Sequence, residues 1–201
     1  SGAGLFADSR IENLARIQTN KPRLLLRVAA AGQADAVVRT ADISLQSEID
    51  TIRLLAAAAA RAGTTHRVVL MIDLGDLREG LYFTDYDAIE RTAREIAGLR
   101  SIKLVGVGTN LTCFGAILPD ERNLGALADI ARRLRSALGL ELPIVSGGNS
   151  SSVGLLLAGK LPHGVTNLRL GESILLGNNV LTTQPLDRLL DRQYSAARLL
   201  L

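Results

Sequence analysis

A glycine- and serine-rich segment, Ser146–Ser152, is the part of the sequence best suited to hold an anion. It follows a short apolar run and opens a helical pattern at Ser151. Small residues let backbone N–H groups approach a phosphate, and the start of a helix favours negative charge. A helix cap needs only one serine, whereas three follow two glycines here, so the residues favour phosphate binding over a simple cap.

A second polar segment, Asp73–Gly80, follows a near-continuous apolar run. Its guanidinium, on Arg78, has the fork geometry that binds a carboxylate with two hydrogen bonds. The alternative is a surface salt bridge between Arg78 and either Asp76 or Glu79. The sequence leaves both interpretations open.

The single cysteine and the two histidines offer less chemistry. Cys113 follows a polar strand end, yet a small packed cysteine is favoured over a nucleophile because no histidine adjoins it. His66 and His163 are both predicted to lie in loops. One cysteine excludes an internal disulfide and a cysteine-based zinc site, and two histidines are too few for a metal site, so we predict no metal.

The composition sets the class of protein. The chain has 201 residues, 47% of them hydrophobic, no tryptophan and a net charge of +3, enough for one sizeable domain with an aliphatic core. The basic run Arg132–Arg135 lies in a helical pattern without aromatic neighbours, which predicts an exposed helix face and no nucleic-acid partner. No apolar run reaches the length of a membrane span, and no signal peptide is present, so we expect a cytoplasmic chain without membrane contact.

Short apolar runs alternate with helical patterns along the chain. Strands are predicted at Gly4–Ala7, Leu24–Val28, Ala41–Leu45, Arg67–Asp73, Ile102–Val107, Pro143–Ser146 and Thr166–Leu170. Helices are predicted at Ile11–Ile17, from a cap at Ser47 to an end at Gly63, and at Asp85–Ala97, Glu121–Leu138 and Ser151–Gly159.

This alternation predicts an α/β fold with a parallel sheet. A doubly wound open sheet needs a glycine fingerprint after its first strand, and none is present. We therefore predict a TIM-type (β/α)8 barrel with seven strands visible and the first strand missing upstream. Residues 1–180 are expected to form this incomplete barrel, and 181–201 a C-terminal tail or the start of a following segment.

Function in such a barrel lies where the strands end. The predicted strand ends are rich in polar residues and glycine: Asp8–Arg10, Arg27, Ser44–Ser47, Asp73–Arg78, Gly108–Asn110, Ser146–Ser152 and Arg169–Ser173. The serine loop and the Arg169 segment follow the last two strands, which is where barrels often bind phosphate.

Six motifs in this order resemble the ornithine-racemase-like group of the alanine racemase superfamily, which are enzymes that use pyridoxal 5'-phosphate (PLP). The motifs are Asp8–Asn13, Ile43–Glu48, Asp73–Gly80, Gly108–Cys113, Ser146–Ser152 and Leu168–Gly177, and the resemblance covers residues 4–180.

The resemblance implies a PLP cofactor and a role for each matching residue. Asn149 and Ser150 would hold the phosphate, with backbone N–H groups of Gly171 and Glu172. Arg169 would face the pyridine nitrogen and keep it unprotonated, and Arg169→Glu should then change the cofactor without disturbing the fold. Arg78 would lie near the substrate carboxylate.

The implied activity is racemisation of a free amino acid, ornithine or alanine, by removing and returning the Cα proton through a PLP aldimine. The alternative is a non-catalytic PLP carrier of the same superfamily. The Schiff-base lysine of the family is expected upstream of Ser1, and the catalytic residues stay unknown. We therefore expect the chain to be a fragment of the barrel domain that is inactive alone. No catalytic role is assigned to Tyr194. A homodimer is compatible with the family.

Overall fold

A computed structural model describes residues 3–112, 116–182 and 185–186 of the chain. Its strands form one curved sheet with the order β1-β2-β3-β4-β6-β7, in which all neighbours run parallel, and a short β5 pairs with the end of β4. The strands are β1 (Phe6–Asp8), β2 (Arg23–Leu25), β3 (Ile43–Gln46), β4 (His66–Asp73), β5 (Leu81–Tyr82), β6 (Ile102–Gly108) and β7 (Ile144–Ser146).

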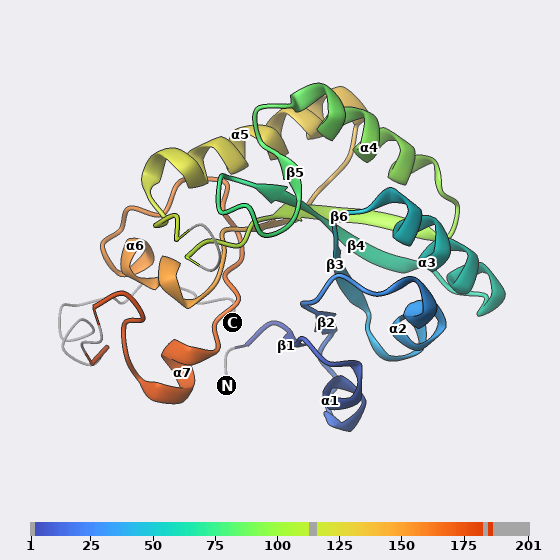
Figure 1. The fold of residues 1–201 in the computed structure, drawn as a ribbon, viewed down its shortest axis with the longest axis horizontal. Helices are drawn as coiled ribbons and strands as arrows, with labels where there is room; N and C mark the ends of the chain where they lie inside the picture. The colour runs from blue at the N-terminus through green and yellow to red at the C-terminus, as the bar shows by residue number, and fades with distance from the viewer. Residues whose placement is uncertain (1–2, 113–115, 183–184, 187–201) are drawn as a thin grey trace.

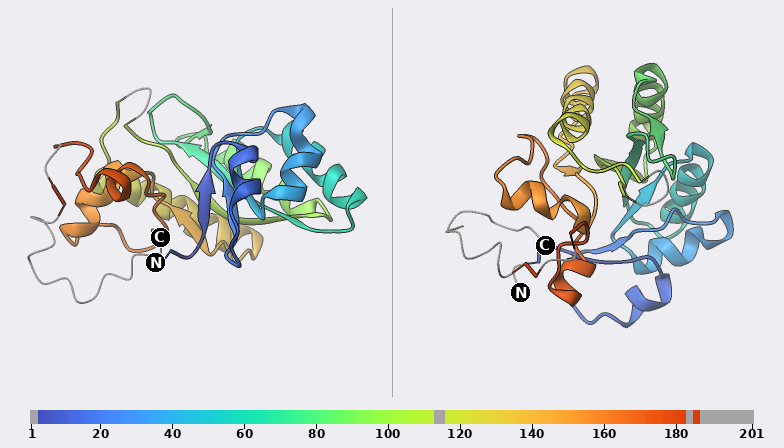
Figure 2. Two further views of the ribbon diagram at one scale, coloured as in Figure 1. Left: turned by 90° about the horizontal axis from the view of Figure 1, so that it is seen from below. Right: turned by 60° about the vertical axis from the view of Figure 1, so that its left-hand side comes forward.

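The helices lie in an arc around these strands (Figures 1 and 2). They are α1 (Ile11–Arg16), α2 (Ala34–Thr40), α3 (Ile49–Arg61), α4 (Tyr86–Gly98), α5 (Glu121–Leu138), α6 (Val153–Leu157) and α7 (Glu172–Leu176), with 3-10 turns η1 (Ala31–Gln33) and η2 (Ser150–Ser152). Parallel strands joined by helices on the outer side of a curved sheet are the arrangement of a TIM-type β/α barrel. The expected fold class is confirmed.

Both faces of the sheet are buried, which explains the continuous apolar run of β4. Val68, Leu70 and Ile72 pack against helix side chains on the outer face. Val69 and Met71 belong to a smaller cluster on the inner face, made of strand residues alone. Because successive side chains of a strand alternate, β4 fills both layers and ends with Asp73 at the edge of the inner space.

Most predicted elements are present, and two details were wrong. The helix after β3 begins at Ile49 with Glu48 as its N-cap, so Ser47 lies one residue too early to cap it. The predicted strand Thr166–Leu170 is reduced to a single bridge between Asn167 and Ser146. Backbone hydrogen bonds still join this segment to β7, among them Thr166 N to Val145 O and Gly147 N to Asn167 O, both at 2.9 Å. Thr166 Oγ1 adds two side-chain bonds, because it accepts from Val145 N and donates to Pro143 O.

Four short elements were not predicted: η1, α2, β5 and α7. The expected helix face around Arg132–Arg135 is present in α5. Arg132 pairs with Asp129, and the Arg133 guanidinium lies 3.3 Å from the centre of the Tyr86 ring. Within the described residues, no helix is both long and apolar enough to cross a bilayer.

Candidate functional site

The strand ends gather polar side chains around three adjoining hollows. The arginine hollow, about 240 Å³, is lined by Ser9, Leu26, Arg27, Leu45, Arg78, Asn110, Asn149 and Arg169. The acidic hollow, about 540 Å³, is lined by Val28, Ser47, Glu48, Asp73, Leu77, Arg78, Glu79 and Gly80. The two share Arg78. Their residues follow six of the parallel strands, at the end where the sequence predicts that function gathers.

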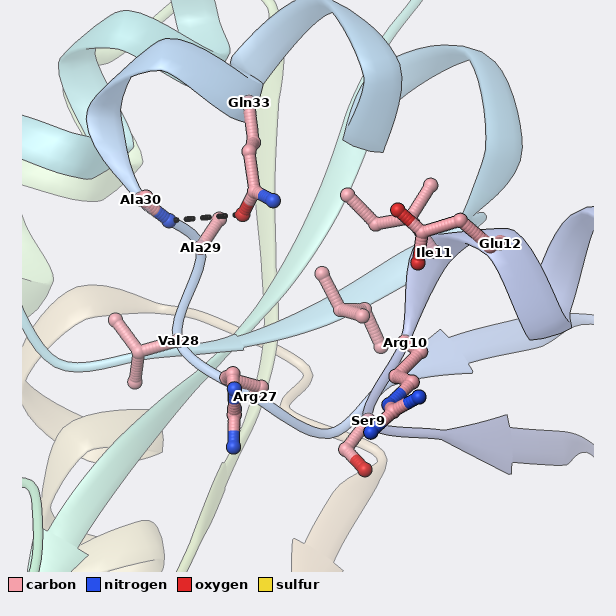
Figure 3. Close-up of a pocket in the computed structure, with 10 residues that line it drawn as sticks. Ser9, Arg10, Ile11, Glu12, Arg27, Val28, Ala29, Ala30 and Gln33 are labelled. Carbon is pink, nitrogen blue, oxygen red and sulfur yellow. Dashed lines mark hydrogen bonds between the residues drawn. The ribbon is translucent and has the colours of Figure 1, made fainter.

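A third, outer hollow of about 550 Å³ lies beside α1 and η1 (Figure 3). It shares Ser9 and Arg27 with the arginine hollow. Gln33 lies further along this hollow, where its Oε1 accepts a hydrogen bond from Ala30 N at 3.3 Å. Arg27 thus stands between two hollows, just beyond the end of β2.

The loop after β4 is held by its own acidic side chains. Asp73 Oδ1 accepts hydrogen bonds from Gly75 N at 2.8 Å and Leu77 N at 3.1 Å. The loop then returns to β4 at Gly80, where a Cβ atom would lie 2.8 Å from Asp73 N and from the Met71 carbonyl. Only glycine permits this close approach. The return of the loop to β4 at Gly80 fixes the positions of the preceding side chains, Arg78 and Glu79.

Arg169 joins the ends of β6 and β7. It is 8% exposed, and its Nη2 donates to Thr109 O at 2.7 Å. Its two Nη atoms also donate to Ser146 Oγ and Asn110 Oδ1. Burial with several acceptors is the setting in which a guanidinium is rigidly placed.

Asn110 carries this network onward to the loop after β4. Its amide oxygen accepts from Arg169, and its Nδ2 donates to Glu79 Oε1. Glu79 Oε2 lies 3.6 Å from Arg78 Nε. A chain of polar contacts therefore connects Arg169 to Arg78, two residues that the sequence singled out separately.

Ser150 Oγ is the meeting point of three donors. Gly171 N and Ser173 N donate to it at 3.2 Å each, and Ser173 Oγ lies 3.1 Å away. Asn149 Oδ1 accepts from Ser151 N at 2.9 Å, which caps the η2 turn. The structure thus brings the serine loop and the Gly171 segment together, as two consecutive strand ends of a barrel should lie.

Both alternatives left open for Arg78 stay predictions, and the structure adds the position of its side chain. Arg78 Nε lies 3.6 Å from Glu79 Oε2, and Asp76 Oδ1 accepts a hydrogen bond from Ile117 N at 3.1 Å. The Arg78 side chain is still 47% exposed and lines both inner hollows, so this weak pair leaves it accessible to a ligand. Cys113 and Tyr194 lie outside the described residues.

The expectation of a loop position was wrong for His66, whereas His163 does lie in an exposed turn. His66 is the first residue of β4, is 3% exposed and has its Nε2 at 2.8 Å from Ser44 Oγ. Burial, aided by the nearby Arg67 charge, lowers the pKa of His66 to about 4. Ile43 and Leu45 face the inner side of the sheet, so Ser44 between them faces the outer side. His66, which contacts Ser44, is therefore a neutral core histidine on the outer side of the sheet.

Three residues that the sequence placed at strand ends without a role prove central: Arg27, Asn110 and Ser146. Asn110 and Ser146 are direct partners of Arg169, and Arg27 divides two hollows. Their signal was only their position after a strand, since polar residues there are common and their partners lie far away along the chain.

The lysines lie away from these hollows. Lys21 precedes β2 and donates to Ala3 O, and Lys160 Nζ lies 3.6 Å from Glu121 Oε1. Lys103, near the start of β6, borders a separate hollow with Gly139–Pro143, at the opposite end of the strands. In the described part of the chain, no group of three or more His, Cys, Asp or Glu side chains is arranged for a metal ion.

Known proteins agree with this architecture. Alanine racemase of Clostridium difficile 630 superposes with a TM-score of 0.75 at 18% identity, over 92% of this chain and 50% of that one. PipY of Synechococcus elongatus, solved with PLP bound, superposes with a TM-score of 0.67 at 18% identity, over 84% of this chain and 80% of that one. At this level of identity, the similarity shows the fold.

Sequence comparison identifies the family. The model of the alanine racemase N-terminal domain matches residues 1–179. An ornithine racemase of Acetoanaerobium sticklandii is 51% identical over 173 residues, 86% of this chain and 48% of that protein. A lysine racemase of Thermotoga maritima is 33% identical over 190 residues, 93% of this chain and 52% of that protein, so the chain spans about half of each curated relative. The chain belongs to the alanine racemase N-terminal domain family.

Proposed function

We propose that this chain is the cofactor- and substrate-binding part of a PLP-dependent racemase of a free amino acid, with ornithine the first candidate substrate and alanine the second. The observation that carries the proposal is that a group of hydrogen-bond donors and a chain of polar contacts lie at the same end of the strands. Donors gathered at Ser150 lie on one side, and the Arg169–Asn110–Glu79–Arg78 chain of contacts leads away from them. The names of the two curated relatives support it.

The donor set fits the phosphate of PLP. Two backbone N–H groups and one hydroxyl converge on a single oxygen, Ser150 Oγ, and this gathering of donors supports an anion site here. A Cβ atom built on Gly171 would meet nothing within 4 Å, so there is open space in front of its backbone. Asn149, Ser150 and Gly171 would hold the phosphate. Glu172 would contribute its backbone N–H, since its side chain is exposed.

Arg169 would orient the pyridine ring. A guanidinium keeps its protons at any physiological pH, so it cannot transfer one to a ring nitrogen. PLP, when bound, withdraws electrons from the Cα atom of an amino acid and so lets the Cα proton leave. A ring kept unprotonated by Arg169 would make this withdrawal weaker and would favour simple return of the proton over side reactions.

Arg78 would bind the carboxylate of the amino acid. It lies at the border of the two inner hollows, its side chain is 47% exposed, and Glu79 is one of its partners. The half-buried contact with Asn110 would keep Glu79, and through it Arg78, in position. These residues bind and orient, and none of the three lysines is assigned the Cα proton.

The test is a racemase assay on the complete gene product with PLP and a panel of L-amino acids, read by chiral chromatography. We expect racemisation of ornithine or alanine. A protein that shows PLP absorbance but racemises no amino acid would support the carrier alternative and contradict the proposal.

Ser150→Ala tests the phosphate assignment separately. Loss of one hydrogen bond should weaken PLP binding by about 0.5–1.5 kcal/mol, and more where the phosphate charge strengthens it. Ser136→Ala, on the exposed face of α5, is the matched control. Equal PLP affinities of the two variants, measured by absorbance titration, would remove Ser150 from the phosphate site.

A further inference from the structure

The two inner hollows carry opposite charge. Arg27, Arg78 and Arg169 line the arginine hollow. The acidic hollow has three carboxylates, on Glu48, Asp73 and Glu79, against the single shared guanidinium of Arg78. A ligand that spans the border at Arg78 would therefore meet a positive environment at one end and a negative environment at the other.

The three carboxylates differ in what already satisfies them. Asp73 Oδ1 accepts two backbone N–H groups, and Glu79 contacts both Asn110 and Arg78. Glu48 is exposed and is the N-cap of α3 without a side-chain capping bond. Among the described residues it has no ion pair either, so Glu48 is the carboxylate whose charge is available to a ligand.

An independent feature of the same hollow is Ser47. It is only 8% exposed, and its buried Oγ has no hydrogen-bond partner in the part of the chain that the structure describes. An unsatisfied buried hydroxyl costs free energy, so such groups usually have a partner in the functional state. Ser47 continues the inward alternation of Ile43 and Leu45, and it lines the acidic hollow beside Glu48. It offers an acceptor to a donor that enters there.

An ammonium group matches this pair of acceptors. It carries three donors and one positive charge, whereas a methyl group has no donor for Ser47 Oγ and no charge to attract the Glu48 carboxylate. Resting on the proposed function, we propose that Glu48 and Ser47 form the subsite for the distal ammonium of a diamino-acid substrate whose carboxylate lies at Arg78. Glu48 then determines specificity, because it distinguishes a charged side-chain end from an apolar one of equal length.

The experiment compares L-ornithine with L-norvaline, which has the same carbon chain without the ammonium. Binding of each to the complete gene product is measured by calorimetry, with the racemisation rate as a second readout. Glu48→Gln should weaken ornithine binding about fivefold, the upper end for an exposed ion pair, and leave norvaline binding within twofold. Charge reversal in Glu48→Lys should weaken ornithine binding at least tenfold.

Glu12→Gln is the matched control, because Glu12 is an acidic residue of the outer hollow. It should change neither affinity by more than twofold. Ser47→Ala is a second variant and should weaken ornithine binding about threefold, as for one lost hydrogen bond.

The outcomes separate the two proposals. If ornithine is racemised but Glu48→Gln binds it as the parent protein does, the subsite is wrong and the proposed function stands. The same holds if the loss is equal for ornithine and norvaline, because the variant then acts on the shared backbone of the ligand. If neither amino acid binds or is racemised, the proposed function fails and this inference fails with it.

Discussion

Replacing Arg169 with methionine should destabilise the fold itself, apart from any effect on ligand binding. Arg169→Met keeps an unbranched side chain as far as the position of Nε and removes the guanidinium donors. Ser146 Oγ keeps its hydrogen bond to Asn167 Oδ1, whereas Thr109 O and Asn110 Oδ1 each lose a partner. At about 1–3 kcal/mol for each acceptor left unsatisfied, less the cost of holding a buried charge, the free energy of unfolding should fall by about 2–4 kcal/mol.

The assay is urea unfolding followed by circular dichroism. Arg100→Met is the control, since Arg100 is exposed and should change the free energy of unfolding by no more than about 0.5 kcal/mol. A loss below about 1 kcal/mol in Arg169→Met would refute the view that Arg169 ties β6 to β7. The same contacts argue against the expectation that Arg169→Glu leaves the fold undisturbed. The new carboxylate would face the oxygens of Thr109 and Asn110 and should lower the stability of the protein.

Three further predictions concern stability and labelling. Because the pKa of His66 is lowered in the folded protein, the unfolded chain binds the imidazole proton at a higher pH than the folded protein does. The free energy of unfolding should therefore be unaffected above about pH 6.5 and fall by about 3 kcal/mol as the pH drops towards 4. His66→Gln should flatten that dependence in pH-resolved urea melts, and an unchanged slope would show that other groups cause it. Gly106→Ala should prevent folding or cost more than about 3 kcal/mol, because its Cβ would lie 1.9 Å from Ile144 O. Gly125→Ala in α5, where nothing lies within 4 Å, should instead stabilise by about 0.5–1 kcal/mol in thermal melts, and equal effects of the two changes would contradict the packing at β6. Borohydride reduction of this chain with PLP, followed by peptide mapping, should give no stoichiometric label on Lys21, Lys103 or Lys160. A stoichiometric label on any of them would contradict their placement away from the hollows.

The sequence by itself was sufficient for the order of elements and for the fold class. The bounds of α5 follow from the helical period of its apolar residues and from Asp120, whose side chain caps it. The continuous apolar run of β4 indicates a strand buried on both faces. These features are local or periodic, so they can be read from neighbouring residues. The resemblance to a known family also rests on local motifs, and the comparisons confirm it.

Only the tertiary structure decided which strand-end residues meet. Asn110 and Glu79 are 31 positions apart, and Arg169 and Asn110 are 59 apart, so no local pattern indicates either contact. The same reason explains the errors: buried His66 has its partner in Ser44, 22 positions earlier, and the expected eighth strand meets β7 through a single bridge between Asn167 and Ser146. Propensity and periodicity describe the chain near each residue, whereas burial and hydrogen bonding at the strand ends depend on the register of a sheet built from distant segments.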